Sequence, residues 1–571
     1  MEKLEIAWLF TEIADLLEIK GDNPYRIRAY RRAARALKGF PGDIRQLWTE
    51  DKLETIPGIG RELAAKIGEF LSTGTSRYLE ELRQEVPPGL LDMLAVPEVG
   101  PKTVHTIYSH LGITSLEQLA EAARKRQLRQ LPGLGPKTEL RILKGINLVN
   151  SRRGRMPLGV ALPLAEELYE DLASLDGVEA ISFTGSLRRC RDEVGDVDLL
   201  VAAGEGERIV ELFSHSPRLA QILAKGKNRV VARTELGIEV DLWVVAPDQY
   251  APALLWATGS RRHYQRLQER AAALDIELAE CQVLKSGKPL TVKAEEEIYR
   301  LLELAYIPPE LREDRGEVEA AAKGKLPSLV TLADIQGDFH SHTNWSDGVE
   351  SIEEMAAAAR ERGYRYLAIT DHSHALGVAG GLTPERVLEQ AKKVWEINRK
   401  LPADFQLLAG TEVDILADGS LDFPDSVLER LDVVIASVHS HFRQDQETMT
   451  RRIIKAISNP HVDILAHPSG RLLGRREPYA VDLEAVLAAA AERGTVLEIN
   501  SSPDRLDLTD TWARRAKELG VKLAVNTDAH AGEGLREINY GIMVARRAWL
   551  EPQDLINTWP WERVRDYFAK R

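Results

Sequence analysis

The chain has 571 residues, of which 44% are hydrophobic and 29% charged, with a formal net charge of −13. This composition is typical of globular proteins, and the length exceeds what one hydrophobic core serves, so we expect several domains. Two cysteines argue against a disulfide framework, the N-terminal residues lack the pattern of a signal peptide, and no apolar run suits a membrane span, so we expect a cytoplasmic protein.

A repeated turn pattern marks residues 1–150, which are predicted to be helical. The pattern is an apolar residue, a proline, any residue, an apolar residue and a glycine, followed by a helix. It occurs in IPGIGRELAAKI (56–67), VPEVGPKTVHTI (96–107) and LPGLGPKTELRI (131–142). Glycines at such turns let the backbone approach a phosphate, toward which the first N–H groups of the helix point. One copy is an ordinary turn, whereas three predict nucleic-acid binding that fixes position without reading sequence. The glycines concerned are Gly58, Gly60, Gly100, Gly133 and Gly135.

Positive charge is concentrated in this part of an otherwise acidic chain. Residues 20–38 contain seven Lys or Arg and one Asp, and NPYRIRAYRRAARAL (23–37) is predicted to form a basic amphipathic helix. Such a charged face is commonly only a solvated surface. Beside the three glycine turns, it favours contact with a nucleic-acid backbone.

Three aspartates characterise the next region, which is predicted to contain a helix (163–175) and strands with the sequences ISFTG, DVDLLVA and GIEVDLWVV. Asp196 and Asp198 are separated by one residue in a strand, so their side chains point to one face, and Asp241 completes the set from a neighbouring strand. Clustered carboxylates repel one another unless cations bind, and oxygen ligands suit two Mg²⁺ or Mn²⁺ ions. Two such ions can stabilise the attacking and leaving oxygens of an in-line phosphoryl transfer.

A phosphate-binding turn precedes the aspartates. Gly185 and Ser186 would hold phosphate oxygens, while Arg155 and Arg189 would neutralise their charge. An isolated Asp-x-Asp is common by chance. The complete arrangement of Gly-Ser, Asp-x-Asp and a distant Asp is typical of a nucleotidyltransferase.

Residues 1–315 resemble the bacterial family X DNA polymerases, which are relatives of DNA polymerase beta. The resemblance rests on the basic helix with the first glycine turn, on FTGSLRRCRDEVGDVDLLV (183–201) and on WATGS (256–260). It implies a multidomain fold in which an α+β palm performs template-directed gap filling with deoxynucleoside triphosphates. The implied parts are a lyase-like helical domain (1–80), a helix-hairpin-helix fingers domain (81–150), a nucleotidyltransferase palm (151–245) and a thumb with the nucleotide pocket (246–315).

The resemblance also implies individual roles. Trp256 and Gly259 would line the nucleotide pocket, Arg26 would contact a DNA phosphate, and Lys66 would form a Schiff base with an abasic deoxyribose phosphate. A Schiff-base lysine must be partly neutral, and a plain surface lysine is the alternative for Lys66. The chain departs from the family because Glu62 stands where the beta enzyme has another lysine.

Further departures occur around the pocket, at Ala257, Arg261 and Tyr264. These departures do not change the three aspartates, but the resemblance then does not predict the sugar discrimination or the fidelity of nucleotide addition.

The C-terminal part is predicted to be a parallel α/β barrel-like domain. Residues 316–334, with small residues and a proline, are predicted to be a linker. From 335 to 571, short apolar strands alternate with helices. The strands contain RYLAIT, FQLLAG, VVIASV, VDILAH, TVLEIN and KLAVNT.

Metal-ligand residues follow these strands. Nine of the 13 histidines lie between 340 and 530, together with carboxylates at strand ends, where barrel folds place their active groups. The predicted ligands are His340, His342, Asp347, His372, Glu412, His439, His467, Asp528 and His530. This number of mixed nitrogen and oxygen ligands suits two or three Mn²⁺, Zn²⁺ or Fe ions, which would generate hydroxide near neutral pH. We expect His374, His441 and His461 to be structural.

The spacing of these ligands resembles that of the PHP domain, which bacterial family X polymerases carry at the C-terminus. It implies a manganese-dependent 3′–5′ exonuclease, with abasic-site endonuclease and 3′-phosphatase activities. Arg471 is either a ligand of the substrate phosphate or a surface residue.

The leading hypothesis is a DNA repair enzyme that trims 3′ ends and fills short gaps in gapped or nicked DNA. We take a monomer near the nucleoid as the default. One alternative is a small-molecule phosphatase, which the DNA-binding half disfavours. Another is a PHP nuclease or phosphatase on a DNA-binding scaffold with weak or lost polymerase activity, which Ala257 and Tyr264 make conceivable.

Overall fold

The computed structural model describes residues 2–38, 40, 44–56, 58–96, 99–152, 155–234 and 237–569. It divides into two compact units, one formed by Met1–Arg153 and the other by nearly all of the remaining chain. Among the described helices, none combines the length and the apolar character that crossing a membrane requires.

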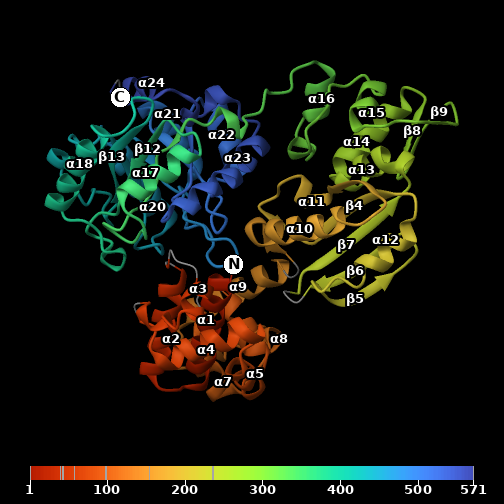
Figure 1. The fold of residues 1–571 in the computed structure, drawn as a ribbon. Helices are drawn as coiled ribbons and strands as arrows, with labels where there is room; N and C mark the ends of the chain where they lie inside the picture. The colour runs from red at the N-terminus through yellow and green to blue at the C-terminus, as the bar shows by residue number, and fades with distance from the viewer. Residues whose placement is uncertain are drawn as a thin grey trace. The chain divides into compact units, whose positions relative to one another are not determined.

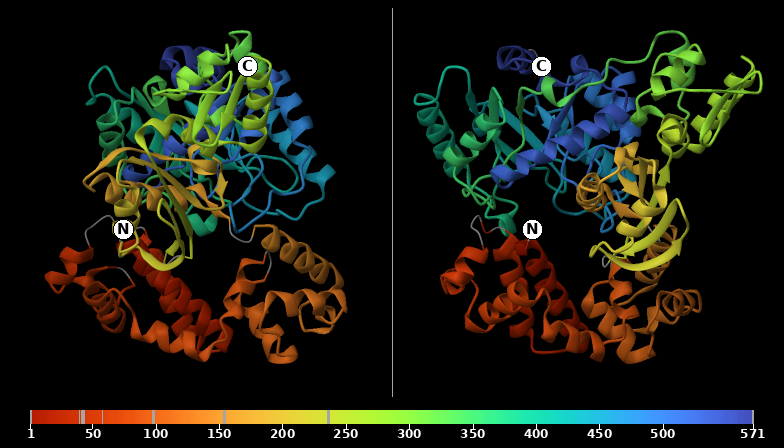
Figure 2. Two further views of the ribbon diagram at one scale, coloured as in Figure 1. Left: turned by 90° about the vertical axis from the view of Figure 1, so that its right-hand side faces the viewer. Right: turned by 45° about the vertical axis from the view of Figure 1, so that its right-hand side comes forward.

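The first unit is helical throughout its described residues (Figures 1 and 2). Its core is organised by the first helix, whose buried Ile6, Phe10, Ile13 and Leu17 repeat at the three- and four-residue spacing of an amphipathic helix. The α-helices are α1 (Glu2–Lys20), α2 (Pro24–Lys38), α3 (Ile44–Thr49), α4 (Arg61–Thr73), α5 (Arg77–Glu85), α6 (Gly89–Asp92), α7 (Pro101–Leu111), α8 (Leu116–Arg124) and α9 (Pro136–Arg152).

The second unit begins with the palm region, a five-stranded sheet with the order β2-β4-β7-β6-β5. Strands β4 and β7 are parallel, and the other pairs are antiparallel. The strands are β2 (Val178–Phe183), β4 (Val197–Ala203), β5 (Leu219–Lys225), β6 (Arg229–Thr234) and β7 (Glu239–Val245); the helices are α10 (Leu158–Ala173), α11 (Gly185–Arg188) and α12 (Gly206–Phe213). The parallel pairing of β4 and β7 places residues of the two strands directly beside each other, and the site described below is built on this pairing.

The thumb region has its own small core, which includes Leu267, Ile298 and Tyr299. It contains α13 (Tyr250–Thr258), α14 (Arg261–Ala272), the antiparallel strands β8 (Ile276–Ala279), β9 (Gln282–Lys285) and β10 (Lys288–Leu290), and α15 (Glu295–Leu301).

The segment 316–334 is more ordered than the predicted linker. It contains helix α16 (Glu317–Ala322), and the fully buried Glu317 carboxylate lies 2.7 Å from Nδ1 of His263 in α14. Val330 is also buried. A buried polar side chain therefore anchors the start of this segment to the thumb region.

The barrel domain, residues 337–569, is built on a seven-stranded parallel sheet in the order β11 to β17. A parallel bridge between Ser341 and Ala529 joins the last strand to the first, so the sheet nearly closes on itself. The strands are β11 (Gly337–Asp338), β12 (Tyr366–Ile369), β13 (Gln406–Asp414), β14 (Val433–Ser437), β15 (Ile464–Leu465), β16 (Val496–Asn500) and β17 (Leu523–Asn526).

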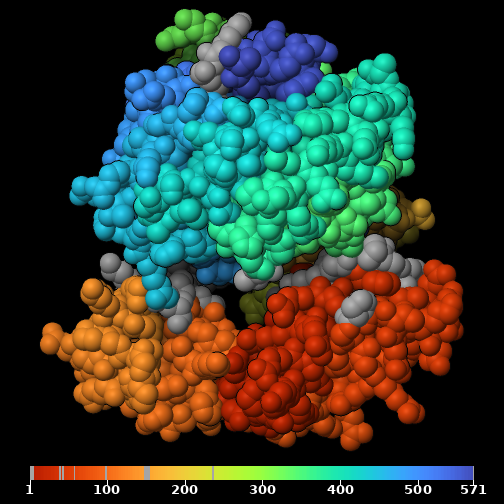
Figure 3. Space-filling view, turned by 90° about the vertical axis from the view of Figure 1, so that its left-hand side faces the viewer, coloured from red at the N-terminus to blue at the C-terminus, as the bar shows by residue number. Residues whose placement is uncertain are grey.

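Both faces of these strands are buried, as expected for a parallel sheet covered by helices. Tyr366 and Ala368 pack in one cluster, whereas Leu367 and Ile369 pack in another. Figure 3 shows one outer face of this domain, where side chains cover the sheet completely. The helices are α17 (Ile352–Glu361), α18 (Pro384–Asn398), α19 (Asp425–Leu428), α20 (Gln446–Ile457), α21 (Leu483–Arg493), α22 (Asp510–Glu518), α23 (Ile538–Arg547) and α24 (Trp561–Phe568).

Candidate active sites

The first site lies where β4 and β7 run side by side in the palm region. Asp198 and Asp241 occupy the same register position of these parallel strands, and Asp196 immediately precedes β4. Burial and the two neighbouring aspartates raise the pKa of Asp198 to about 7, and burial with the charge of Asp241 raises the pKa of Asp196. This mutual repulsion between oxygen donors fits a site that divalent cations neutralise.

Gly185 is required by close approach to this group. Its φ is +57°, and a Cβ built there would lie 1.9 Å from Oδ2 of Asp198. Asp198 is therefore packed directly against the Gly185–Ser186 turn at the start of α11. Only glycine leaves space for both the turn and the carboxylate.

Cationic side chains around the aspartates differ from the sequence prediction. Asp241 accepts hydrogen bonds from Arg229 of β6, a contact that sequence reasoning missed. Arg155 is exposed, and its charge partly offsets the increase in the pKa of Asp196. The charge of Arg189 acts to lower the pKa of Asp198, and its guanidinium donates to the main-chain oxygen of Thr258 at 2.6 Å and to Glu313 at 3.0 Å. As placed, Arg189 stabilises the junction of the palm and thumb regions.

The pocket residues of WATGS end helix α13. Trp256 remains 37% exposed and packs edge-on against Trp243, with 5.3 Å between the ring centroids. Gly259 has a φ of +64° and follows Thr258, whose carbonyl holds Arg189. Tyr264 is buried and donates to the main-chain oxygen of Ala279. The Tyr264 hydroxyl is thus engaged within the thumb region.

In the first unit, the three glycine turns have the same backbone hydrogen bond. Ile59 N donates to Ile56 O, Val99 N to Val96 O, and Leu134 N to Leu131 O, at 3.0 to 3.1 Å. Each turn leads into a helix, α4, α7 or α9. A Cβ at Gly60, Gly100, Gly133 or Gly135 would meet no atom within 4 Å, so these backbones face open space. At Gly58, by contrast, φ is +88° and an added Cβ would lie 3.2 Å from the Arg32 side chain.

The predicted lyase residues meet around one aromatic ring. Nζ of Lys66 lies 4.0 Å from the centroid of the Tyr78 ring, and Arg26 donates to the Tyr78 hydroxyl at 2.6 Å. Arg26 also pairs with Asp22 at 3.2 Å. Two cationic side chains, partly exposed, therefore meet at Tyr78, as binding of a phosphate would require.

The second site is formed at the carboxyl ends of the barrel strands. Three groups of side chains have potential ligand atoms within 4.8 Å of one another, and together they include every predicted ligand of the barrel except His467. The groups are His342, Asp347, His372 and His530; His340, His342, Glu412 and Asp528; and His372, Glu412 and His439. Because they share His342, His372 and Glu412, the groups are contiguous. His467 joins them through its Nε2, which lies 3.1 Å from Glu412.

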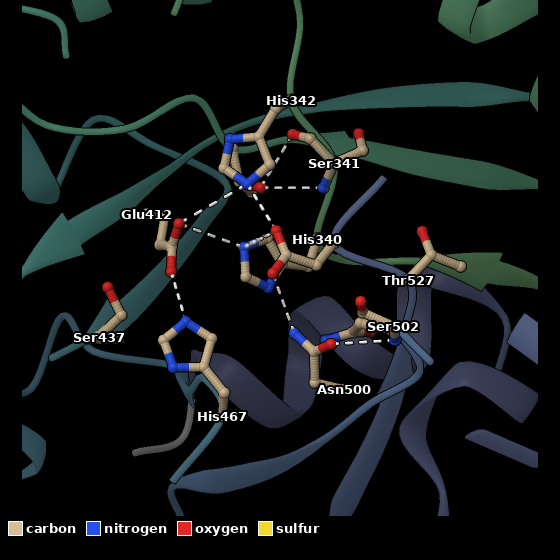
Figure 4. Close-up of polar contacts among 12 residues, drawn as sticks. His340, Ser341, His342, Glu412, Ser437, His467, Asn500, Ser502 and Thr527 are labelled. Atoms are coloured by element: carbon tan, nitrogen blue, oxygen red, sulfur yellow. Dashed lines mark hydrogen bonds and ion pairs between the residues drawn. The ribbon is translucent and has the colours of Figure 1, made fainter. Parts of the chain in front are cut away.

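A layer of buried polar residues orients these ligands, and sequence reasoning missed it. Glu498 of β16 accepts from Nδ1 of His340 at 2.7 Å, which leaves Nε2 facing Glu412 and Asp528 at 3.4 Å each. Asn500 donates to Asp528 at 3.1 Å. Figure 4 shows His340, His342 and His467 turned toward Glu412. A carboxylate behind a histidine that holds its tautomer is typical of metal sites.

The electrostatics of this cluster also fit cations. The histidines hold the pKa values of Glu412 and Asp528 well below their usual range, and Asp347 raises the pKa of His530 to about 9 despite burial. Nδ1 of His342 and Nδ1 of His467 are buried and find no hydrogen-bond partner in the described part of the chain. Anionic carboxylates beside imidazole nitrogens form a donor set for Zn²⁺, Mn²⁺ or Fe.

The remaining predicted residues lie outside the cluster. Arg471 pairs with Asp192 of the palm region at 2.9 Å, and it donates to the main-chain oxygens of Arg505 and Leu506. The prediction that Arg471 binds phosphate or lies free on the surface is therefore corrected, because its guanidinium is engaged on both sides. His374 and His441 are exposed.

Family models match four parts of the chain. They are a helix-hairpin-helix domain at residues 1–76, a SAM-like helix-hairpin-helix tandem at 90–147, a DNA polymerase beta thumb at 253–313 and a PHP domain at 338–502.

Curated relatives cover the chain at two scales. The DNA polymerase/3′-5′ exonuclease PolX of Bacillus subtilis is 38% identical over 561 residues, covering 98% of this chain and 97% of that protein. A probable phosphatase of Thermoanaerobacter sp. is 34% identical over 232 residues, covering 39% of this chain and 89% of that protein. A probable phosphatase of Shewanella sp. (strain ANA-3) is 31% identical over 238 residues, or 39% and 87% of the two chains.

Proposed function

The chain belongs to the bacterial family X DNA polymerases with a C-terminal PHP domain, and on that premise we propose a repair enzyme that fills short DNA gaps in its palm and trims 3′ ends in its barrel. The relative that matches nearly the whole chain is named for both activities. Its substrates would be gapped or nicked DNA and deoxynucleoside triphosphates. The protein would act as a monomer in the cytoplasm, near the nucleoid.

The register of Asp198 opposite Asp241 is the observation that carries the polymerase proposal. With Asp196, these carboxylates would hold two Mg²⁺ or Mn²⁺ ions, which when bound would activate a primer 3′-hydroxyl and support the leaving diphosphate. The Gly185–Ser186 turn would present its backbone to the triphosphate, and Arg155 would add positive charge. Trp256 and Gly259 would border the incoming nucleotide.

The contiguous ligand groups support the exonuclease proposal. The histidines and carboxylates of the barrel would hold two or three Mn²⁺, Zn²⁺ or Fe ions, which when bound would supply a hydroxide nucleophile. Glu498 would fix the orientation of His340, and Asn500 that of Asp528. The same chemistry would serve 3′-phosphatase and abasic-site endonuclease activities.

The open turns of the first unit support DNA binding that does not depend on sequence. Backbone N–H groups at Gly60, Gly100, Gly133 and Gly135 would donate to phosphate oxygens. Arg26 would add a phosphate contact, and Lys66 would attack an abasic sugar.

A separation-of-function experiment tests the two centres. Purified protein is given a labelled duplex with a one-nucleotide gap, with and without nucleotides. Asp198→Asn should abolish extension and spare degradation, whereas Asp528→Ala should abolish degradation and spare extension. Loss of both activities in each variant would contradict two independent centres.

A second candidate is a phosphatase or nuclease on a DNA-binding scaffold with weak polymerase activity. The observation that favours it is the engagement of Arg189 by Glu313 and the Thr258 carbonyl, which removes one expected triphosphate contact. This second candidate function predicts that the protein removes a 3′-phosphate from DNA but adds no measurable nucleotide in the presence of Mn²⁺.

A further inference from the structure

A cationic side chain that is not among the predicted ligands lies at the edge of the barrel centre. Arg505 is in the loop that follows β16, and its Nε is 3.7 Å from Oδ2 of Asp528. Its side chain is 17% exposed. The guanidinium therefore lies beside one of the predicted metal ligands of the barrel centre.

The guanidinium has unused hydrogen-bonding capacity. Nη1 of Arg505 is buried and has no hydrogen-bond partner among the described residues. A buried donor without a partner destabilises the fold, and more so when the group is charged. A fixed positive charge also opposes binding of cations by its neighbours. Both effects are reversed by an anion that contacts the ions and the guanidinium together.

The backbone around Arg505 is held in place on both sides. Arg471 donates to the main-chain oxygens of Arg505 and Leu506, and Ser469 N donates to the Asp507 carboxylate at 3.0 Å. Leu506 has a φ of +46°, a conformation that non-glycine residues adopt only when their surroundings enforce it. The backbone position of Arg505 is thus built into the fold.

We propose that Arg505 binds the scissile phosphate in the barrel centre. This inference rests on the proposed exonuclease function. Planar guanidinium groups bind phosphate oxygens through paired hydrogen bonds, and they remain charged throughout. In the reaction, an oxygen from water bonds to phosphorus as the bond from phosphorus to the 3′ oxygen breaks. The electron pair stays on that 3′ oxygen, which gains the proton lost by the water. Arg505 transfers no proton and stabilises charge on a non-bridging oxygen.

The test compares Arg505→Met and Arg505→Lys with Arg360→Met, a change at an exposed position of α17. Three quantities are measured on full-length protein: bound metal by mass spectrometry, affinity for inorganic phosphate by calorimetry, and kcat/KM for removal of 3′ nucleotides. In Arg505→Met we expect unchanged metal content, phosphate affinity reduced at least ~10-fold, and kcat/KM reduced ~10²–10³-fold. Arg505→Lys should recover part of both losses, and Arg360→Met should match the parent.

Two results would overturn the proposal. One is unchanged phosphate affinity in Arg505→Met. The other is loss of metal from both Arg505 variants, which would make the residue a structural partner of Asp528. If the parent protein binds phosphate through Arg505 but degrades no 3′ end, the exonuclease function fails while the phosphate site stands.

Discussion

Arg547, on helix α23 of the barrel domain, donates its Nη1 to the main-chain oxygen of Arg189 in the palm region at 2.7 Å. The same guanidinium reaches Glu313 at 3.1 Å and Asp510 at 2.9 Å, with a side chain only 5% exposed. Arg189 follows the Gly185–Ser186 turn that packs on Asp198. A residue of the barrel domain is therefore part of the support for the polymerase centre.

Replacing Arg547 by Met should impair nucleotide addition more than degradation. It would leave Glu313 and Asp510 short of a buried partner, at a cost of about 3 kcal/mol in the free energy of unfolding. Steady-state kinetics should show a raised KM for nucleotide, and thermal unfolding should give a lower Tm. Arg546→Met is the matched control, because Arg546 pairs with Glu310 and does not contact Arg189. If both variants changed the KM for nucleotide equally, Arg547 would have no specific role in supporting the polymerase centre.

Gly185→Ala should disable the palm while preserving the fold. The new Cβ would displace the Asp198 carboxylate, and a shift of ~1 Å in a reacting group costs about 10²-fold in rate. Gly204→Ala is the control, since nothing lies within 4 Å of a Cβ there. Primer extension would show the difference, with far-ultraviolet circular dichroism verifying the fold. Wild-type extension by Gly185→Ala would mean that Asp198 is placed differently in the working enzyme.

Glu498→Gln should weaken metal binding by the barrel. Loss of the carboxylate behind His340 removes the group that fixes its tautomer, and such changes reduce metal affinity roughly 10- to 100-fold. Competition with a chromophoric chelator measures the affinity. Glu484→Gln, a change at an exposed ion pair with Arg515, serves as the control. The idea fails if the two variants retain metal equally.

Metal affinity of the barrel should rise with pH. The pKa of His530 is raised to about 9 in the metal-free protein, so this ring is protonated at neutral pH and a proton must leave before the ring can bind an ion. Affinity should therefore increase between about pH 7 and 9 and level off above that range. Metal titrations in two buffers of different ionisation enthalpy would count the released protons. Binding without proton release at pH 7 would contradict a ligand role for His530.

Borohydride trapping on an abasic duplex tests Lys66. A Schiff base requires the neutral amine, so the yield of adduct should increase with pH and vanish in Lys66→Ala. The control is Lys52→Ala, which changes an exposed lysine paired with Glu50 and should give the same yield of adduct as the parent protein. An adduct that survives the loss of Lys66 would assign the chemistry to another amine.

The sequence predicted groups that act through strict local spacing and missed those that depend on distant partners. Asp196 and Asp198 are two residues apart at the start of a strand, and the barrel ligands lie at the ends of apolar strands, so their placement follows from periodicity alone. The partners of Arg189, Arg471 and Glu317 come from far along the chain or from another region. No local pattern distinguishes such an arginine from a ligand of phosphate. Glu498, within a run of buried strand residues, offered only the signal of an acid at an apolar position.

Every strand of the barrel contributes to its centre. The chain supplies His340 and His342 after β11, Glu412 within β13, Glu498 within β16, and Asp528 and His530 only after β17. A nascent chain therefore cannot assemble the full set until its last strand has left the ribosome, by which time the palm and thumb have been synthesised. The degradative activity of this enzyme should thus mature last, so that truncated translation products are poor nucleases.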